Sequence, residues 1–170
     1  MQAKLLGHPI HPMLIVFPLG LLATGVAFDI VGLVQSDSSW YSISYWLIAS
    51  GIIGGLLAAV FGLLDWIGIP SGTRAKRIGL LHGGTNVVVV LLFIVSWFMR
   101  GSAANVPSNG ALTLSFIGVA LALVGGWLGG ELVDRLGIGV DAGAHPDAPS
   151  SLSNRPTAER ESRGPVKRAA

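Results

Sequence analysis

GHPIHPMLIVFPLGLLATGVAFDIVGL, residues 7–33, is the stretch that decides the fold. From residue 12 onward it is apolar over about 20 residues, the length of a helix that crosses a hydrocarbon core about 30 Å thick. Proline is tolerated in the first turn of a helix, so Pro12 indicates the helix entry, whereas Pro18 lies inside the span and should kink it. The run is too long for a signal-peptide core and has no clear small-x-small cleavage site. We therefore expect a retained first span over residues 12–33.

The same apolar pattern recurs over residues 43–67, 78–99 and 112–133. The chain of 170 residues is 51% hydrophobic and 12% charged, whereas soluble domains carry about 25% charged residues. Its mean hydropathy is +0.66. The sequence therefore predicts an all-α integral membrane protein, with four transmembrane helices in a bundle over residues 1–140. The absence of cysteine excludes disulfides and thiolate metal ligands.

The composition changes abruptly after the fourth span. Residues 141–170 are rich in proline, serine, alanine and charged residues and contain few large apolar side chains. Such a segment cannot bury enough apolar surface to offset the entropy lost on folding. We expect residues 141–170 to form a disordered basic tail.

Lysine and arginine are concentrated at one end of the predicted bundle. They occur before the first span, in the second loop and after the fourth span, whereas the first loop has none and the third has only Arg100. Because basic residues accumulate on the cytoplasmic side of membrane proteins, both termini and the tail should be cytoplasmic. This topology also explains the net charge of +2 and the pI near 9.4. The expected partner is therefore the lipid bilayer and not nucleic acid.

Ionisable side chains in or beside the spans are the candidate functional residues. A charge in the hydrocarbon region is costly, so it is usually paired or functional. With both termini cytoplasmic, five such side chains reach one level near the cytoplasmic ends of the spans: His8, His11, Asp65, His82 and Glu131. Asn86 follows His82 by four residues and shares its helix face.

Four interpretations of this cluster stay open. The five side chains are suitable ligands for a divalent metal ion such as zinc, iron or manganese. His11 and His82 could instead bind the iron of haem b from its two axial sides. Histidines and carboxylates also form proton relays. Finally, the groups could be structural. They could reach the headgroups, or they could form ion pairs, Asp65 with a basic residue of the second loop and Glu131 with Arg135 or the tail.

Asp29 lies toward the other end of the first span. The basic residue nearest to that level is Arg100, at the end of the third span. We expect Asp29 and Arg100 to form an ion pair that joins the two helices, because an unpaired carboxylate there would be costly. The competing interpretation is that Asp29 reaches the headgroup region alone.

Glycines spaced four residues apart predict close contacts between helices. Helices in lipid associate through van der Waals packing, which small residues favour because they let two backbones approach. The pairs are Gly51 with Gly55, Gly125 with Gly129, and Gly126 with Gly130.

Several of these motifs together resemble a family of bacterial membrane proteins, domain of unknown function 2231. The resemblance covers roughly residues 7–140 and includes GHPIHP at 7–12, GLLDW at 62–66, IPSGTR at 69–74, His82 with Asn86, and GGWLGGELV at 125–133. It implies a four-helix membrane fold in the bacterial inner membrane. It implies no established reaction.

The sequence favours a binding protein over an enzyme. It has no glycine-rich phosphate loop, no HExxH motif and no nucleophile elbow. A haem or metal site would suit a redox role alongside membrane redox partners. A proton or solute conduit would favour a homo-oligomer, because four short spans leave little room for a central path.

Overall fold

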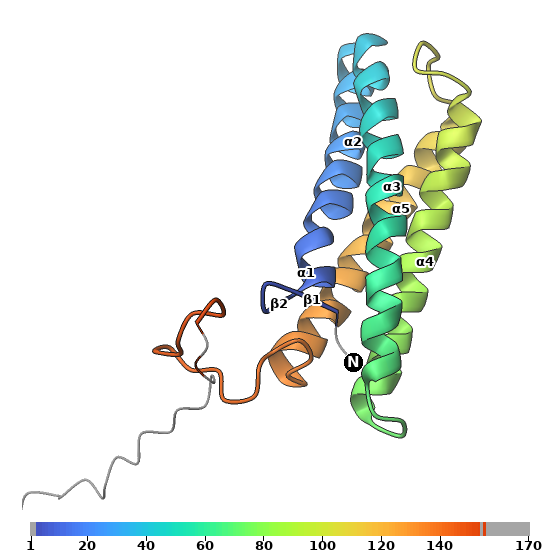
Figure 1. The fold of residues 1–170 in the computed structure, drawn as a ribbon. Helices are drawn as coiled ribbons and strands as arrows, with labels where there is room; N and C mark the ends of the chain where they lie inside the picture. Colours follow the sequence, from blue (N-terminus) through green and yellow to red (C-terminus); the bar gives the residue numbers. More distant parts are fainter. Residues whose placement is uncertain (1–2, 154, 156–170) are drawn as a thin grey trace, which may run out of the picture.

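The computed structural model describes residues 3–153 and residue 155, and it places four long helices side by side in a bundle (Figure 1). A short hairpin and one helical turn precede the first long helix, and a π-helical turn follows the last. In chain order the elements are β1 (Lys4–Leu5), β2 (His8–Pro9), α1 (Ile10–Leu14), α2 (Val16–Gln35), α3 (Ser39–Gly68), α4 (Arg74–Arg100), α5 (Asn109–Gly130) and η1 (Glu131–Arg135).

Four segments of the described chain are long and apolar enough to cross a membrane: Ile10–Gln35, Ser39–Gly68, Arg74–Arg100 and Asn109–Arg135. The predicted all-α membrane architecture with four helices is confirmed. The 30 residues of α3 measure about 45 Å at about 1.5 Å per residue, which exceeds a hydrocarbon core of about 30 Å. The helix must therefore tilt or extend past the core.

Residues 141–153 form turns without helix or strand. This is the first part of the segment predicted to be a disordered tail. Residues 154 and 156–170, the rest of that predicted tail apart from Arg155, lie outside the described residues.

The first span is interrupted at Ile15, between α1 and α2. Pro18 explains this interruption, because it has no N–H for the carbonyl of Leu14 and its ring collides with that carbonyl. Around the break, the Ile15 N–H still donates to the His11 carbonyl at 3.1 Å. His11 lies in α1, the short helical segment before the break.

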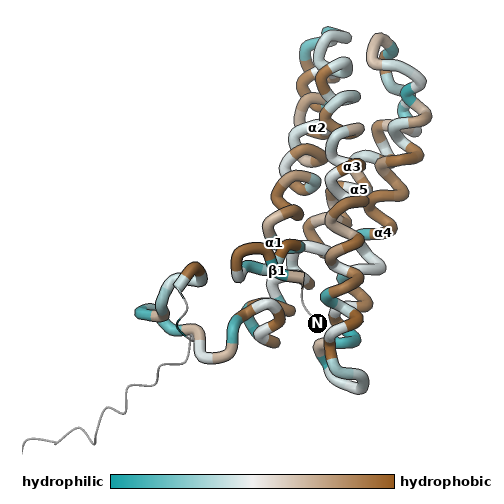
Figure 2. Tube along the Cα trace, in the orientation of Figure 1, coloured by the Kyte–Doolittle hydropathy of each residue, from teal (hydrophilic) through white to brown (hydrophobic). Residues whose placement is uncertain are grey.

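The bundle consists of two helix pairs, α2 with α3 and α4 with α5, which meet mainly where α3 contacts α4. Its apolar core is formed by Leu22, Val26, Ile48, Ile52, Val89 and Phe93. A Cβ atom added at Gly51 would lie 2.7 Å from the Leu22 side chain, so this predicted glycine does permit a close helix contact. Hydrophobic residues occur along all four long helices (Figure 2), and many of the large ones, such as Phe17, Leu80 and Leu123, are exposed, as contact with lipid requires.

Candidate functional site

Two polar clusters occupy opposite ends of the bundle. Near the end without the chain termini, Asp29 of α2 and Arg100 of α4 form a bidentate ion pair. Nη2 of Arg100 donates to Oδ2 of Asp29 at 2.6 Å, and Nη1 donates to Oδ1 at 2.9 Å. Both side chains are buried, with at most 1% of either exposed. The structure thus brings together the two residues that the sequence suggested as a pair.

Three buried serines complete this first cluster. Arg100 also donates to Oγ of Ser44 at 3.3 Å and to Oγ of Ser115 at 3.2 Å. The hydroxyls of Ser96 and Ser115 are 2.8 Å apart, and Ser96 donates to the Ala111 carbonyl at 2.7 Å. All four long helices therefore contribute to one hydrogen-bonded network, which provides several of the bonds that a buried charge pair needs.

The second cluster contains His11 of α1 and His82 of α4. Their ring centroids are 6.2 Å apart and the ring planes are perpendicular. Nδ1 of His11 lies 2.9 Å from the Ala58 carbonyl oxygen, and Nδ1 of His82 lies 2.9 Å from that of Gly125. Because a carbonyl oxygen only accepts hydrogen bonds, each Nδ1 must carry the proton. In the neutral imidazole, Nε2 then keeps its lone pair, which is the state that binds a metal.

Glycines on α3 and α5 make room for the two imidazole rings. A Cβ atom added at Gly62 would lie 2.8 Å from Cε1 of His11, and one added at Gly129 would lie 3.1 Å from Cε1 of His82. A side chain at either position would therefore press on the imidazole ring beside it. Gly129 belongs to a predicted glycine pair, but it packs against the His82 ring and not against a helix backbone.

Asn86 packs against His82 from one turn further along α4. Its Nδ2 donates to the His82 carbonyl at 2.9 Å. The same atom lies 3.3 Å from Nε2 and 3.4 Å from Nδ1 of the ring. An atom almost equidistant from both ring nitrogens lies over the ring and not along either lone pair. Asn86 therefore steadies the ring without occupying the Nε2 acceptor.

The other three predicted metal ligands have partners elsewhere. Oδ1 of Asp65 accepts a 3.3 Å bond from the Ala3 N–H, and Nε2 of His8 lies 3.2 Å from Oγ of Ser151. Glu131 accepts from Arg74 at 2.6 Å, and not from Arg135. Among the described residues, no three histidines or carboxylates come together in a group that could hold a metal ion. The structure thus brings His11 and His82 together but does not gather the five side chains around one point.

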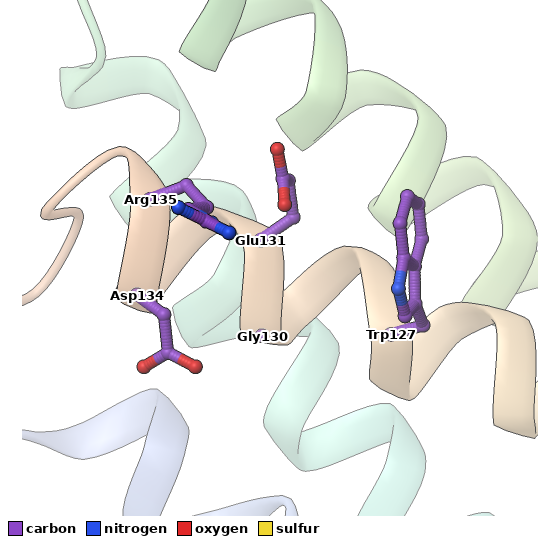
Figure 3. Close-up of a pocket in the computed structure, with 5 residues that line it drawn as sticks. All are labelled: Trp127, Gly130, Glu131, Asp134 and Arg135. Atoms are coloured by element: carbon purple, nitrogen blue, oxygen red, sulfur yellow. The ribbon is translucent and has the colours of Figure 1, made fainter.

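A shallow cavity of about 200 Å³ lies at the junction of α5 and η1 (Figure 3), lined by Trp127, Gly130, Glu131, Asp134 and Arg135. The carboxylates of Glu131 and Asp134 point to opposite sides of the helix (Figure 3). Neither His11 nor His82 lines this cavity. It is therefore separate from the histidine pair.

Residues 7–142 match the family described as "Predicted membrane protein (DUF2231)". The chain belongs to this family, and the resemblance seen in the motifs is confirmed. No curated protein and no solved structure matches the chain. The protein is thus a multi-pass membrane protein of a family whose description gives no activity.

Proposed function

We propose that the chain is a haem-binding protein of the bacterial inner membrane, with His11 and His82 as the two axial ligands of haem b in a redox role. The observation that carries this proposal is the proximity of two imidazoles from separate helices, whose ring centroids are 6.2 Å apart. In each imidazole the Nδ1–H donates to a backbone carbonyl, which leaves the Nε2 lone pair for iron.

The spacing of the rings suits one metal ion between them. An ion held between two imidazoles by bonds of about 2.0–2.1 Å has ring centroids roughly 6 Å apart, because each centroid lies about 1 Å behind its nitrogen. The observed separation of 6.2 Å agrees with this value. Next to His82 in the sequence, a Cβ atom at Gly83 or Gly84 would meet nothing within 4 Å, so the surface of α4 is uncovered at these two positions.

The number of ligands favours haem over a bare metal ion. A zinc site usually takes three or four ligands from the protein. Haem brings four nitrogens of its own and needs only two from the protein, which this pair can supply. When bound, haem would supply one-electron chemistry, and its electrons would come from and go to membrane redox partners.

The distribution of charge supports a cytoplasmic location for both termini. Lys4, Lys76 and Arg77 lie at the end of the bundle that carries His11 and His82. At the opposite end the one basic residue, Arg100, is buried against Asp29. The loops at that end present no basic side chain to the surface. The two ends of the bundle therefore differ strongly in exposed positive charge.

Absorption spectroscopy of the detergent-purified protein, loaded with hemin and then reduced with dithionite, tests the proposal. We expect a sharp Soret band and the narrow α band of low-spin, six-coordinate haem. His11→Ala and His82→Ala should each abolish the low-spin signature. His8→Ala is the matched control, because His8 is exposed in the same motif, and it should retain the spectrum. A loaded protein with only the spectrum of unbound hemin would refute haem ligation.

A structural role for the two histidines is the second candidate. Their Nδ1 bonds join α1 to α3 and α4 to α5, so they also stabilise helix contacts. In that case His82→Ala would lower the unfolding temperature while the wild type bound no haem. A conduit is less well supported, because the packed core residues Val89 and Phe93 lie between the two polar clusters on α4.

A further inference from the structure

The N-terminal hairpin has an unusual apolar turn. β1 (Lys4–Leu5) pairs with β2 (His8–Pro9), and the two turn residues, Leu6 and Gly7, both have positive φ, 51° and 86°. Two-residue turns of this kind favour Asn-Gly, because asparagine tolerates the left-handed region and is polar. Leucine gains nothing from that backbone conformation. Its presence at Leu6 therefore needs another explanation.

The two leucines of the hairpin are exposed to the surroundings of the bundle. Leu5 is 53% exposed and Leu6 is 69% exposed. In water, neighbouring leucines at a protruding tip would be unfavourable, because their apolar surface would stay hydrated. In lipid the same apolar surface would be removed from water.

Contacts with the bundle fix the height of the hairpin. The Ala3 N–H donates to Asp65 near the end of α3, and the Ile10 N–H donates to the Ala3 carbonyl at 3.0 Å. Asp65 precedes Trp66, an aromatic residue of the type that marks a membrane surface. Figure 1 shows the hairpin extending sideways from the bundle at the start of α1. The tip therefore lies level with the membrane surface on the side of the chain termini.

The apolar tip continues the lipid-facing surface of the first span. Met13, Val16 and Phe17, which follow the hairpin along the chain, are all exposed on α1 and α2. Figure 2 shows hydrophobic residues both in the hairpin and in α1, with hydrophilic ones between them. Lys4, the first residue of β1, does not belong to this apolar surface, because it forms an ion pair with Asp141.

We propose that Leu5 and Leu6 insert into the acyl chains of the leaflet on the side of the chain termini. The hairpin is then an interfacial anchor, and its occupant is lipid. Because β2 leads directly into α1, the anchor holds the start of α1 at a fixed depth. This inference does not depend on whether His11 and His82 bind haem.

Spin labelling tests the anchor, since the chain contains no cysteine and each introduced cysteine is the single labelling site. Leu6→Cys carries a nitroxide in the full-length protein, reconstituted in phosphatidylcholine and phosphatidylglycerol vesicles. Collision with oxygen, which concentrates in lipid, is compared with collision with a water-soluble nickel chelate. Leu80→Cys provides the lipid-facing reference, and Ser71→Cys provides the water-exposed reference at the same end; both positions are exposed.

We expect the label at position 6 to prefer oxygen as position 80 does, with a nickel accessibility several-fold below that of position 71. Nickel accessibility equal to position 71 would overturn the proposal. Low accessibility to both reagents would overturn it too, because the tip would then be covered by protein.

A second variant tests whether the leucine side chain itself holds the hairpin in lipid. Leu6→Asn keeps a residue that tolerates the observed φ but removes the apolar group. A label at Leu5→Cys should prefer oxygen with Leu6 present and should become several-fold more accessible to nickel with asparagine there. An unchanged oxygen preference in the Leu6→Asn protein would show that Leu6 does not anchor the hairpin.

Discussion

Asp29 and Arg100 meet through two hydrogen bonds, of 2.6 and 2.9 Å, at a place where neither side chain contacts solvent. They join α2 to α4, which belong to different helix pairs of the bundle. Because the two pairs otherwise meet mainly through α3 and α4, this ion pair is a main link between the halves.

Removing one partner of the ion pair should destabilise the protein strongly. Arg100→Ala leaves the Asp29 carboxylate buried without its cation, for which we expect a loss of about 3–5 kcal/mol in the free energy of unfolding. Arg100→Lys should also destabilise, because an ammonium group cannot reproduce the bidentate geometry. Unfolding in mixed micelles of increasing dodecyl sulfate content measures the effect.

Two controls separate the ion pair from a general effect of charge. Arg77→Ala removes an exposed arginine and should change the free energy of unfolding by less than about 1 kcal/mol. Asp29→Asn combined with Arg100→Gln removes both charges, and it should recover part of the stability lost in Arg100→Ala. If Arg100→Ala were as stable as the wild type, the link between the two helix pairs would lie elsewhere.

Ser96 and Ser115 should behave as one unit. Their hydroxyls are 2.8 Å apart, and Ser115 also accepts from Arg100. Each single change to alanine should cost about 0.6–1.7 kcal/mol, the range of side-chain hydrogen bonds between membrane helices. The double change should cost less than the sum, because the two residues share a bond. A double-mutant cycle by the same unfolding assay measures the coupling, and strictly additive losses would contradict the network.

The sequence predicted the number of helices well because that property depends on length and hydropathy alone. Runs of about 20 apolar residues have few alternatives to a membrane helix. It predicted the Asp29–Arg100 contact from depth, since two opposite charges near one end of a bundle have few other partners. The hairpin over residues 4–9 was not predicted, because it is shorter than any periodic pattern can reveal.

The serine partners could not be predicted from the sequence. A helix that is apolar on all sides has no polar face, so its sequence does not show which residues turn inward. Ser44, Ser96 and Ser115 are three serines among several in and near the spans. In the same way, Arg135 and the tail were the partners considered for Glu131, but Arg74 of another helix reaches it. Such partners depend on the rotation of one helix against the next.

Neighbouring glycines of α5 should respond differently to a methyl group. A Cβ atom at Gly125 would lie 2.7 Å from Oδ1 of Asn86, whereas one at Gly126 would meet nothing within 4 Å. Gly125→Ala should therefore cost about 1–3 kcal/mol in the free energy of unfolding, because it forces Asn86 or α5 to shift. Gly126→Ala is the matched control and should be neutral or slightly stabilising, since alanine has the higher helix propensity. Equal losses in both variants would mean that α5 faces α4 with a different side.

Hemin binding should weaken as the pH falls, with a slope that reports the number of ligating histidines. Iron and a proton compete for the lone pair of Nε2, so an imidazole must be neutral to bind. If His11 and His82 both ligate, the logarithm of the association constant should fall by up to about two per pH unit in the acidic range. If His11→Ala still binds hemin, the logarithm of its association constant should fall by only about one per pH unit.

The measurement is a hemin titration followed by the Soret band between pH 5 and pH 8, with His8→Ala as the control. His8 lies outside the pair and contacts Ser151, so its removal should leave the slope at the wild-type value. A wild-type slope of one that His11→Ala leaves unchanged would mean that only one histidine competes with protons, and His11 would then not be an axial ligand. A slope that drops only in the His8→Ala protein would assign the second axial ligand to the hairpin.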